Sequence, residues 1–510
     1  MSIKQFFLSC SILLFSSIGN SQELKFKVNN LKDTTVHLVR YSGKGMYYAD
    51  TAEVSKGVVK FDGSKHKTGV YALFLPGQKY FDFIHAQEDV DILVEDQKNL
   101  IGSLTVKKSK TNMAFYDYID FMTTQKKAAA KANAEAGTAN EKRKEELKKE
   151  LTDLTNEINT YQKKLVKDNE GTFLADLINI SIDVEIPDAP KDENGVVIDS
   201  FFQYQYFVNH YWDNVNLKNE DIIRTPLFHK KLEAYLSKSV LIQNPDTISL
   251  YADKLIDKVD ESGFLFQYIV SHVTSSSEQS EMMGMENVFV HMADKYYCST
   301  PSRAPWMTDE GITKLCKRVN EMRATLIGQT APRLCLPDST EKNWIDLYKL
   351  PAKYKVVYFW EATCGHCKKA TPKLQDLYAN KLKERGVEIY AVGKAMGEEF
   401  DKWKSFIDAY ELTFVNVGLT KSVYQEAQEN AYNILKNNNT TLESLNYTKT
   451  YDISSTPRIF VLDENNKILY KRLSISQLEE VLDRLQGVPN AKKLYPMSEE
   501  DPEDRERAKE

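Results

Sequence analysis

The sequence has few cysteines for its length, and this limits what they can do. Six occur among 510 residues. So few exclude a fold held together by a framework of disulfides, because such scaffolds are short and rich in cysteine. The eight histidines form no H-E-x-x-H pair, and only one C-x-x-C is present. We therefore expect no metal site and no bound cofactor.

An excess of basic charge is also missing. The chain has 67 Lys and Arg against 73 Asp and Glu, a formal net charge of -6. This balance gives no electrostatic reason to expect a nucleic acid as a partner. Long apolar runs are absent after the first residues, so we expect a soluble mature chain.

Residues 1–21 have the layout of a secretory signal peptide. Lys4 precedes an apolar core from Phe6 to Phe15, and small residues follow up to Ser21. This layout predicts cleavage near Ser21 and an exported, periplasmic protein. Cys10 precedes most of the apolar core, whereas a lipidated cysteine would follow it, so lipid anchoring through Cys10 is not favoured.

Removal of Cys10 leaves five cysteines, Cys298, Cys316, Cys335, Cys364 and Cys367. Since five is odd, at least one thiol stays outside any internal disulfide. A bridge between Cys298 and Cys316 is one alternative for that pair. Buried thiols are the favoured interpretation.

Hydrophobic patterning predicts a multidomain α+β protein. Residues 22–110 alternate apolar and polar positions between glycine-containing turns, which indicates a small antiparallel β-sandwich or barrel. Residues 111–324 follow helical periodicity and predict an all-α domain. Residues 325–486 alternate strands and helices, which predicts an α/β domain with a mixed central sheet. Residues 487–510 are highly charged and are predicted to be a disordered tail.

Residues 143–168 carry apolar side chains at alternating spacings of four and three, beginning at Leu147 and Leu151. Two interpretations are open, an amphipathic helix packed on its own domain and a seam for dimerisation. Gly137 and Thr138 separate this helix from the preceding one.

Cys364 and Cys367 lie where an apolar strand, residues 353–360, meets a helix. A structural disulfide here would close only a short loop and stabilise little. A helix start instead stabilises a thiolate at Cys364, and Cys367 follows on the same side one turn later, within reach for a disulfide. We therefore predict a redox pair, with Cys364 as the nucleophile and Cys367 as the resolving thiol.

The residues next to the cysteines are expected to tune this pair. Gly365 and His366 lie between them, and Lys368 follows. A charged imidazole near the Cys364 sulfur would favour the thiolate. We predict a Cys364 pKa below about 8.5 and a pair more oxidising than about −270 mV.

Three segments in order resemble the TlpA-like thiol–disulfide oxidoreductases of the thioredoxin-like superfamily. They are IGQTAP at 327–332, VVYFWEATCGHCKK around the cysteines, and SSTPRIFVLDENNKILY near the end of the domain. The resemblance implies a cis peptide bond before Pro457 and a Thr456 backbone that faces Cys364. It also implies that Trp360, Thr456 and Pro457 face the substrate.

The chain departs from the pattern of these families at two carboxylates. Tyr358 stands where thioredoxins have a buried acid, and Ala370 stands where many TlpA-like proteins have Glu. Glu361 is the acid nearest in sequence and is our candidate proton acceptor for Cys367. We interpret Cys335 as a packed thiol, and we expect the insertion at 421–449 to reshape the substrate surface.

The leading hypothesis is an exported thiol–disulfide oxidoreductase. Its expected partners are proteins or small molecules with disulfides or dithiols, and a membrane or periplasmic electron donor or acceptor. Disulfide isomerase, thiol peroxidase and a non-enzymatic partner-binding scaffold are the alternatives. A peroxidase would need Thr where the sequence has Glu361.

Overall fold

The computed structural model describes residues 22–438, 440–500 and 502. The predicted signal peptide and Cys10 lie outside these residues. The chain forms two compact units, one with residues up to Ile242 and Leu255–Tyr268, the other with Gln243–Lys254 and the chain from Ile269 onward. Within the described part of the chain, no helix has both the length and the apolar character needed to cross a membrane.

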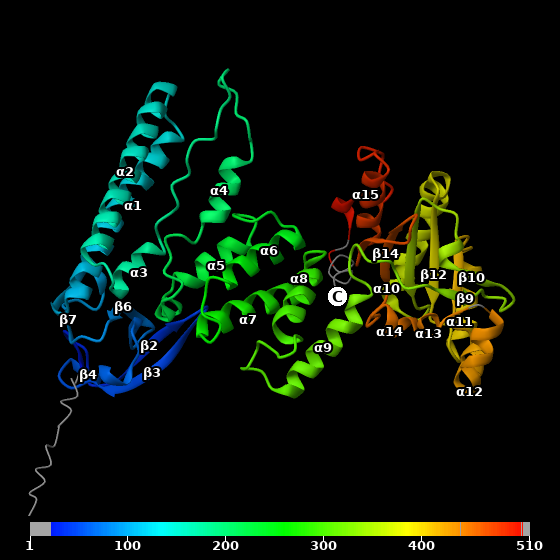
Figure 1. Ribbon diagram of the computed structural model, residues 1–510, viewed down its shortest axis with the longest axis horizontal. Coiled ribbons are helices and arrows are strands. Elements are labelled where there is room, and N and C mark those ends of the chain that lie inside the picture. The colour runs from blue at the N-terminus through cyan, green and yellow to red at the C-terminus, as the bar shows by residue number, and fades with distance from the viewer. Residues whose placement is uncertain (1–21, 439, 501, 503–510) are drawn as a thin grey trace, which may run out of the picture. The chain divides into compact units, whose positions relative to one another are not determined.

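The first unit begins with two four-stranded sheets (Figure 1). Leu24, Phe26, Leu38, Phe83 and Ile92 belong to one buried core that both sheets share, as alternating strand residues must when two sheets pack face to face. The predicted β-sandwich is confirmed, but one pair, β1 and β7, is parallel. The sheets have the orders β4-β1-β7-β8 and β3-β2-β5-β6, with bounds β1 (Glu23–Val28), β2 (Thr35–Ser42), β3 (Gly45–Glu53), β4 (Val58–Asp62), β5 (Gly69–Leu75), β6 (Lys79–His85), β7 (Val90–Val94) and β8 (Leu104–Lys108).

Two long helices follow, α1 (Lys110–Ala136) and α2 (Glu141–Asp168), and they pack against each other as a hairpin (Figure 1). The break between them falls at Gly137 and Thr138, as predicted. Phe121 stacks on Tyr161 with ring centroids 4.1 Å apart. The apolar face of α2 thus has a partner within the chain, and dimerisation through residues 143–168 stays a prediction. The other helices of this unit include α3 (Phe173–Asn179), α4 (Phe202–His210) and α5 (Phe228–Leu236).

The predicted helical domain is divided between the two units, whose boundaries fall inside α6 (Pro245–Ile256) and α7 (Phe264–Glu278). The second unit also has α8 (Met285–Met292) and α9 (Asp309–Arg323). Here Cys298 and Cys316 form a disulfide, with Cα atoms 5.7 Å apart. Our preference for buried thiols at this pair was therefore wrong. The chain between the two cysteines turns so that Cys316 of α9 lies beside Cys298. The spacing of the two cysteines along the sequence does not predict this path.

The α/β domain is built on a five-stranded sheet with the order β13-β12-β11-β14-β15. The β11–β12 and β12–β13 pairs are parallel, and β14 is antiparallel to its neighbours, so the predicted mixed sheet is confirmed. The strands are β11 (Tyr354–Trp360), β12 (Val387–Gly393), β13 (Val415–Gly418), β14 (Arg458–Asp463) and β15 (Ile468–Lys471). A short hairpin, β9 (Cys335–Pro337) and β10 (Trp344–Asp346), lies in the entry segment.

Helices cover both faces of this sheet, and alternate residues of β11 point to opposite cores. Val356 and Tyr358 pack with Leu374 and Leu478 on one face. Val357 packs with residues of the entry segment and of the 421–449 insertion on the other. The helices on the first face are α10 (Gly365–Leu377), α11 (Glu399–Ala409) and α15 (Ile475–Leu485), and those of the insertion are α12 (Lys421–Asn438), α13 (Leu442–Leu445) and α14 (Tyr447–Thr450).

A buried ion pair joins α8 to the edge of this sheet. Glu286 lies 3.2 Å from the Lys471 ammonium and 3.4 Å from the Arg472 guanidinium. Lys471 also donates to the Thr325 carbonyl at 3.1 Å. Because the Glu286 and Lys471 side chains are each no more than 10% exposed, each charge depends on the other for stabilisation.

The predicted disordered tail differs from the structure over residues 488–500. The Leu494 and Tyr495 N–H groups donate to the Glu479 carboxylate of α15, and the Tyr495 hydroxyl donates to Asp376 of α10. The prediction considered the high charge of this segment and overlooked its short apolar stretch, Leu494–Pro496. The acceptors of its hydrogen bonds, Glu479 and Asp376, lie outside the segment and could not be recognised from it.

Candidate active site

Strand β11 delivers the cysteine pair to one edge of the sheet. All seven of its residues are buried, because the strand is central and helices pack on both faces. Cys364 is the N-cap residue of α10, and Cys367 lies in its first turn. The predicted strand-to-helix junction is therefore confirmed.

Trp360 does not take the role that the resemblance implied. Its side chain is 1% exposed, and its ring packs against Phe406 with centroids 5.1 Å apart. A side chain this buried supports the turn that follows β11 and offers no surface to a substrate. The implied substrate-facing role of Trp360 was wrong because the last residue of a central strand is still enclosed by helices.

Thr456 and Pro457 form the wall opposite Cys364. Since β14 runs antiparallel to β11, with Phe359 opposite Arg458, the residues just before β14 lie beside the end of β11. The Thr456–Pro457 peptide bond is cis, as the resemblance implied. The Cys364 thiol donates to the Thr456 carbonyl with an S···O distance of 3.4 Å. Both wall residues are half-buried, so a substrate can reach them.

The surroundings of Cys364 favour its thiolate. Its half-burial would raise the pKa of the thiol, but hydrogen bonds from Cys367, Thr456 and the His366 backbone lower it below its ordinary value. Backbone N–H groups at a helix start have no helical partner and point at the sulfur. The predicted direction is confirmed, and the backbone N–H groups at the helix start contribute to it as expected, while tuning by the His366 imidazole stays a prediction.

Cys367 has the opposite character. It is fully buried, and burial raises the pKa of its thiol to about 12. The Glu361 N–H donates to its sulfur with an N···S distance of 3.5 Å. The structure holds both cysteines as thiols. At neutral pH, therefore, the Cys364 thiol ionises more readily than the Cys367 thiol, which remains protonated.

Tyr358 occupies the core position where the resembling family has an acid. It is fully buried, and its hydroxyl lies 2.8 Å from the Thr371 hydroxyl of α10. Burial raises the Tyr358 pKa far above its ordinary range, so this phenol stays neutral. Tyr358 therefore supplies a polar but uncharged neighbour to the core in which Cys367 lies.

Charged groups lie around the mouth of the site. Glu361, the candidate proton acceptor, pairs with Lys394 at 3.3 Å, and its backbone already contacts Cys367. Lys368 and Gly365 are exposed on the first turn of α10, and His366 is half-buried between them. The residues predicted to tune the pair are thus adjacent to it, and their tuning role stays a prediction.

The insertion contributes to the surface beside Thr456. Tyr447 of α14 is buried and stacks on Phe359 with centroids 5.8 Å apart. Tyr447 and Thr448 line a pocket of about 220 Å³ together with Glu361 and Thr456. The insertion therefore borders this pocket, and its effect on a substrate surface stays a prediction.

Cys335 is the third free cysteine of the described residues, and it is packed in the interior. Its thiol is buried, burial raises its pKa, and its N–H donates to the Ser444 hydroxyl at 3.0 Å. This agrees with the packed thiol that we predicted.

Sequence reasoning missed the C-terminal segment as part of the site. Leu494, Tyr495 and Pro496 line a pocket that His366 and Pro457 also line. The apolar stretch Leu494–Pro496 in an otherwise charged tail was the signal that could have pointed to it.

Comparisons with known proteins agree with this fold. Residues 327–471 match the AhpC/TSA family. Residues 162–324 and 23–115 match two domains of unknown function, DUF5106 and DUF4369. The family model thus ends before α15 and the C-terminal segment, while it includes both cysteines and Pro457.

The chain is similar to thiol-disulfide oxidoreductases named ResA. It is 40% identical to the protein from Oceanobacillus iheyensis over 91 residues, 17% of this chain and 46% of that one. It is 27% identical to the Bacillus cereus protein over 162 residues, 32% and 78% of the two chains. It thus spans about half the length of the first relative. A thioredoxin-like protein from Bacteroides caccae is 17% identical, with a TM-score of 0.41, over 60% of this chain and 98% of that one.

Proposed function

Because residues 327–471 form a thioredoxin-like domain of the AhpC/TSA family, related to the ResA thiol-disulfide oxidoreductases, we propose that this chain exchanges thiols with disulfides through Cys364 and Cys367. One observation carries the proposal. A thiol with a lowered pKa lies 3.4 Å from the Thr456 carbonyl, and a buried thiol with a raised pKa lies one helical turn behind it.

The reaction has two displacement steps. The Cys364 thiolate attacks one sulfur of a substrate disulfide, an S–S bond forms to Cys364, and the other substrate sulfur leaves as a thiolate. Cys367 then loses its proton and attacks the Cys364 sulfur, which releases the second substrate thiolate. Two electrons pass from the dithiol to the substrate, and the Cys364–Cys367 disulfide remains. The reverse sequence oxidises a substrate dithiol.

Thr456 and Pro457 hold the substrate during the first step. The Thr456 carbonyl lies 3.4 Å from the Cys364 sulfur, so an extended substrate chain can pair with this backbone while its sulfur reaches Cys364. Pro457 has no N–H and leaves that side of the wall apolar.

The second step needs an acceptor for the Cys367 proton. Glu361 is our candidate, because its own N–H contacts the Cys367 sulfur and its carboxylate lies on the same turn. The ion pair with Lys394 keeps this carboxylate near the mouth of the site.

We place this reaction in an exported, periplasmic compartment. The layout of residues 1–21 supports export. The Cys298–Cys316 disulfide supports it independently, because such bonds persist mainly in oxidising compartments. The expected partners are substrates with disulfides or dithiols and an electron donor or acceptor in the same compartment.

An insulin-reduction assay tests the proposal. With dithiothreitol as the electron source, the protein should accelerate insulin reduction. Cys364→Ser should abolish the acceleration, because the remaining thiols of Cys335 and Cys367 are buried and have raised pKa values. Cys335→Ala is the matched control, since it removes a thiol outside the site and should retain activity. Activity that survives Cys364→Ser would contradict the proposal.

Trapping identifies the substrates. Cys367→Ser stops the reaction after the first step and should accumulate mixed disulfides through Cys364. These adducts should disappear in the double variant that also carries Cys364→Ser. Adducts that persist there would assign the attack to another thiol.

A further inference from the structure

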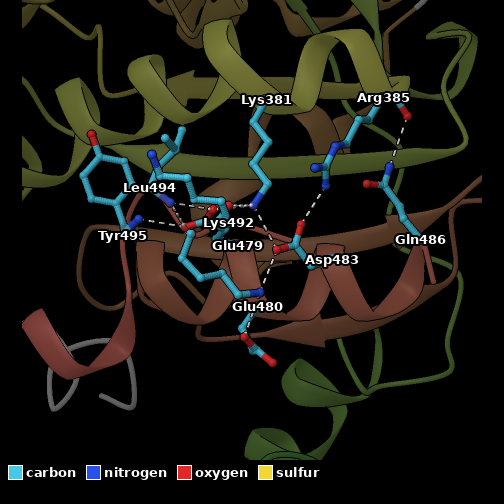
Figure 2. Close-up of polar contacts among 10 residues, drawn as sticks. Lys381, Arg385, Glu479, Glu480, Asp483, Gln486, Lys492, Leu494 and Tyr495 are labelled. Carbon is cyan, nitrogen blue, oxygen red and sulfur yellow. Dashed lines mark hydrogen bonds and ion pairs between the residues drawn. The ribbon is translucent and has the colours of Figure 1, made fainter. Parts of the chain in front are cut away.

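The C-terminal segment, residues 488–500, is held in place by a buried ion cluster, which we define as Lys381, Arg385, Glu479, Asp483 and Lys493. Figure 2 shows Lys381 of η6 (Tyr378–Leu382) and Arg385 of η7 (Lys383–Arg385), the two helical segments that follow α10, reaching toward the carboxylates of α15. The Lys381 ammonium lies 2.5 Å from Glu479 and 2.9 Å from Asp483. Asp483 also pairs with Arg385 at 2.7 Å and with Lys493 at 2.6 Å. Both carboxylate side chains are 0% exposed.

The cluster fixes the main chain of the segment as well as its side chains. The Leu494 and Tyr495 N–H groups donate to Glu479 at 2.9 and 2.8 Å, and Lys381 donates to the Lys492 carbonyl at 3.0 Å (Figure 2). A buried carboxylate that lost these donors would be strongly destabilised. The position of Leu494 is therefore set by the charge balance of the cluster.

This segment forms one wall of a pocket beside the redox pair. Leu494, Tyr495 and Pro496 line one side, and His366, Ala370 and Pro457 line the side that belongs to the active site. Ile459, Leu473 and Ile475 add apolar groups to the lining. The polar groups come from Lys373, Ser474, Ser476, Glu499 and Glu500, so the lining is mixed. The pocket has a volume of about 260 Å³.

We propose that this pocket binds an apolar side chain of a polypeptide substrate, next to the substrate cysteine that bonds to Cys364. The proposal rests on the proposed function. His366 is two residues from Cys364, and Pro457 follows the Thr456 carbonyl that contacts the Cys364 sulfur. A substrate held on Cys364 and along Thr456 can therefore place a neighbour of its cysteine at this pocket, which His366 and Pro457 line.

The size and chemistry of the pocket favour a side chain over a whole small molecule. Ligand pockets for drug-sized molecules span roughly 300–1,000 Å³, and this pocket is smaller. The apolar half of its lining, which includes Ile459, Leu473 and Leu494, rewards the burial of a leucine-like group. Lys373 and Glu499 at its border are suited to the polar main chain on either side of such a group. Leu494 becomes a specificity-determining residue.

Two peptide disulfides test the proposal. Each is a disulfide-linked homodimer of one short peptide, with leucine on both sides of the cysteine in the first and serine in the second. The pre-reduced full chain is mixed with excess peptide, and its second-order rate of oxidation is followed by mass spectrometry of quenched samples. We expect the leucine peptide to react about 10-fold faster, as for other apolar specificity pockets.

Substitutions in the C-terminal segment test whether Leu494 causes the preference for the leucine peptide. Leu494→Asp should bring the ratio of the two rates close to one, and Leu494→Ala should lower it by less. Val488→Asp is the matched control, because Val488 is an exposed apolar residue of the same segment outside the pocket lining, and it should keep the wild-type ratio. Leu494 is 39% exposed, so its replacement leaves the domain core intact.

The outcomes separate this proposal from the proposed function. Equal rates for both peptides in the wild type, or an unchanged ratio in Leu494→Asp, would overturn the pocket while thiol exchange stands. A wild-type protein that neither peptide oxidises would overturn both.

Discussion

Replacing Lys381 with methionine tests how strongly the ion cluster stabilises the α/β domain. The Lys381 side chain is 7% exposed and lies between Glu479 and Asp483, which are 0% exposed. Removal of one partner from a buried ion pair costs about 3–5 kcal/mol, because the remaining charge stays buried. Arg385 and Lys493 still pair with Asp483 in the variant, so we expect the lower end, about 3 kcal/mol.

Hydrogen exchange by mass spectrometry measures this loss within the domain. The most protected amides of β11 and α15 should exchange about 100-fold faster in Lys381→Met, since each 1.4 kcal/mol is a factor of ten. Lys402→Met is the matched control. Lys402 pairs with Glu399 at 3.2 Å but is 54% exposed, and such surface pairs contribute about 0–1 kcal/mol. Equal effects of the two substitutions would refute the role of burial.

Three further predictions concern the cysteines and the pH. Alkylation of Cys364 by iodoacetamide should have a pH midpoint below about 8.5, whereas Cys367 in Cys364→Ser should stay unreactive until far higher pH, since burial raises its pKa to about 12. The double variant Cys298→Ala, Cys316→Ala should lose about 3 kcal/mol in the free energy of unfolding, because the disulfide closes a loop with a sequence separation of 18. Burial opposes ionisation of Asp483, but its cationic partners lower its pKa below the ordinary value. The free energy of unfolding should therefore include this stabilisation above about pH 4 and lose it as the pH falls further. The loss on acidification should be smaller in Asp483→Asn, which has no carboxylate to protonate at this position.

The parts of the fold that were predicted correctly are those that short stretches of sequence indicate by their own pattern. The strand before Cys364 and the helix after it are consecutive in the chain, so their junction could be predicted from the local pattern. The place of Thr456 and Pro457 before β14 was implied by the family resemblance. Alternating and helical periodicities likewise predicted the order of β-rich, helical and α/β regions.

The features that were missed depend on contacts between distant residues. Whether Trp360 faces solvent is decided by Phe406 of α11, and the Cys298–Cys316 bridge is decided by the path of the chain between them. The C-terminal segment was predicted to be a solvated tail from its own charge. The acceptor of its N–H groups is Glu479, which lies in a preceding helix and outside the segment. No periodicity within a segment can report such a partner.

The pair of Glu286 with Lys471 has a practical consequence for dissecting the chain. A fragment that starts at residue 325, the boundary predicted from sequence, would lack Glu286 and leave the buried Lys471 ammonium without the carboxylate that faces it. Such a fragment would have to rearrange the edge of β15 or recruit solvent there. A fragment that retains α8 and α9 keeps the charge balance of the sheet edge, and it is the better starting material for measuring the redox chemistry in isolation.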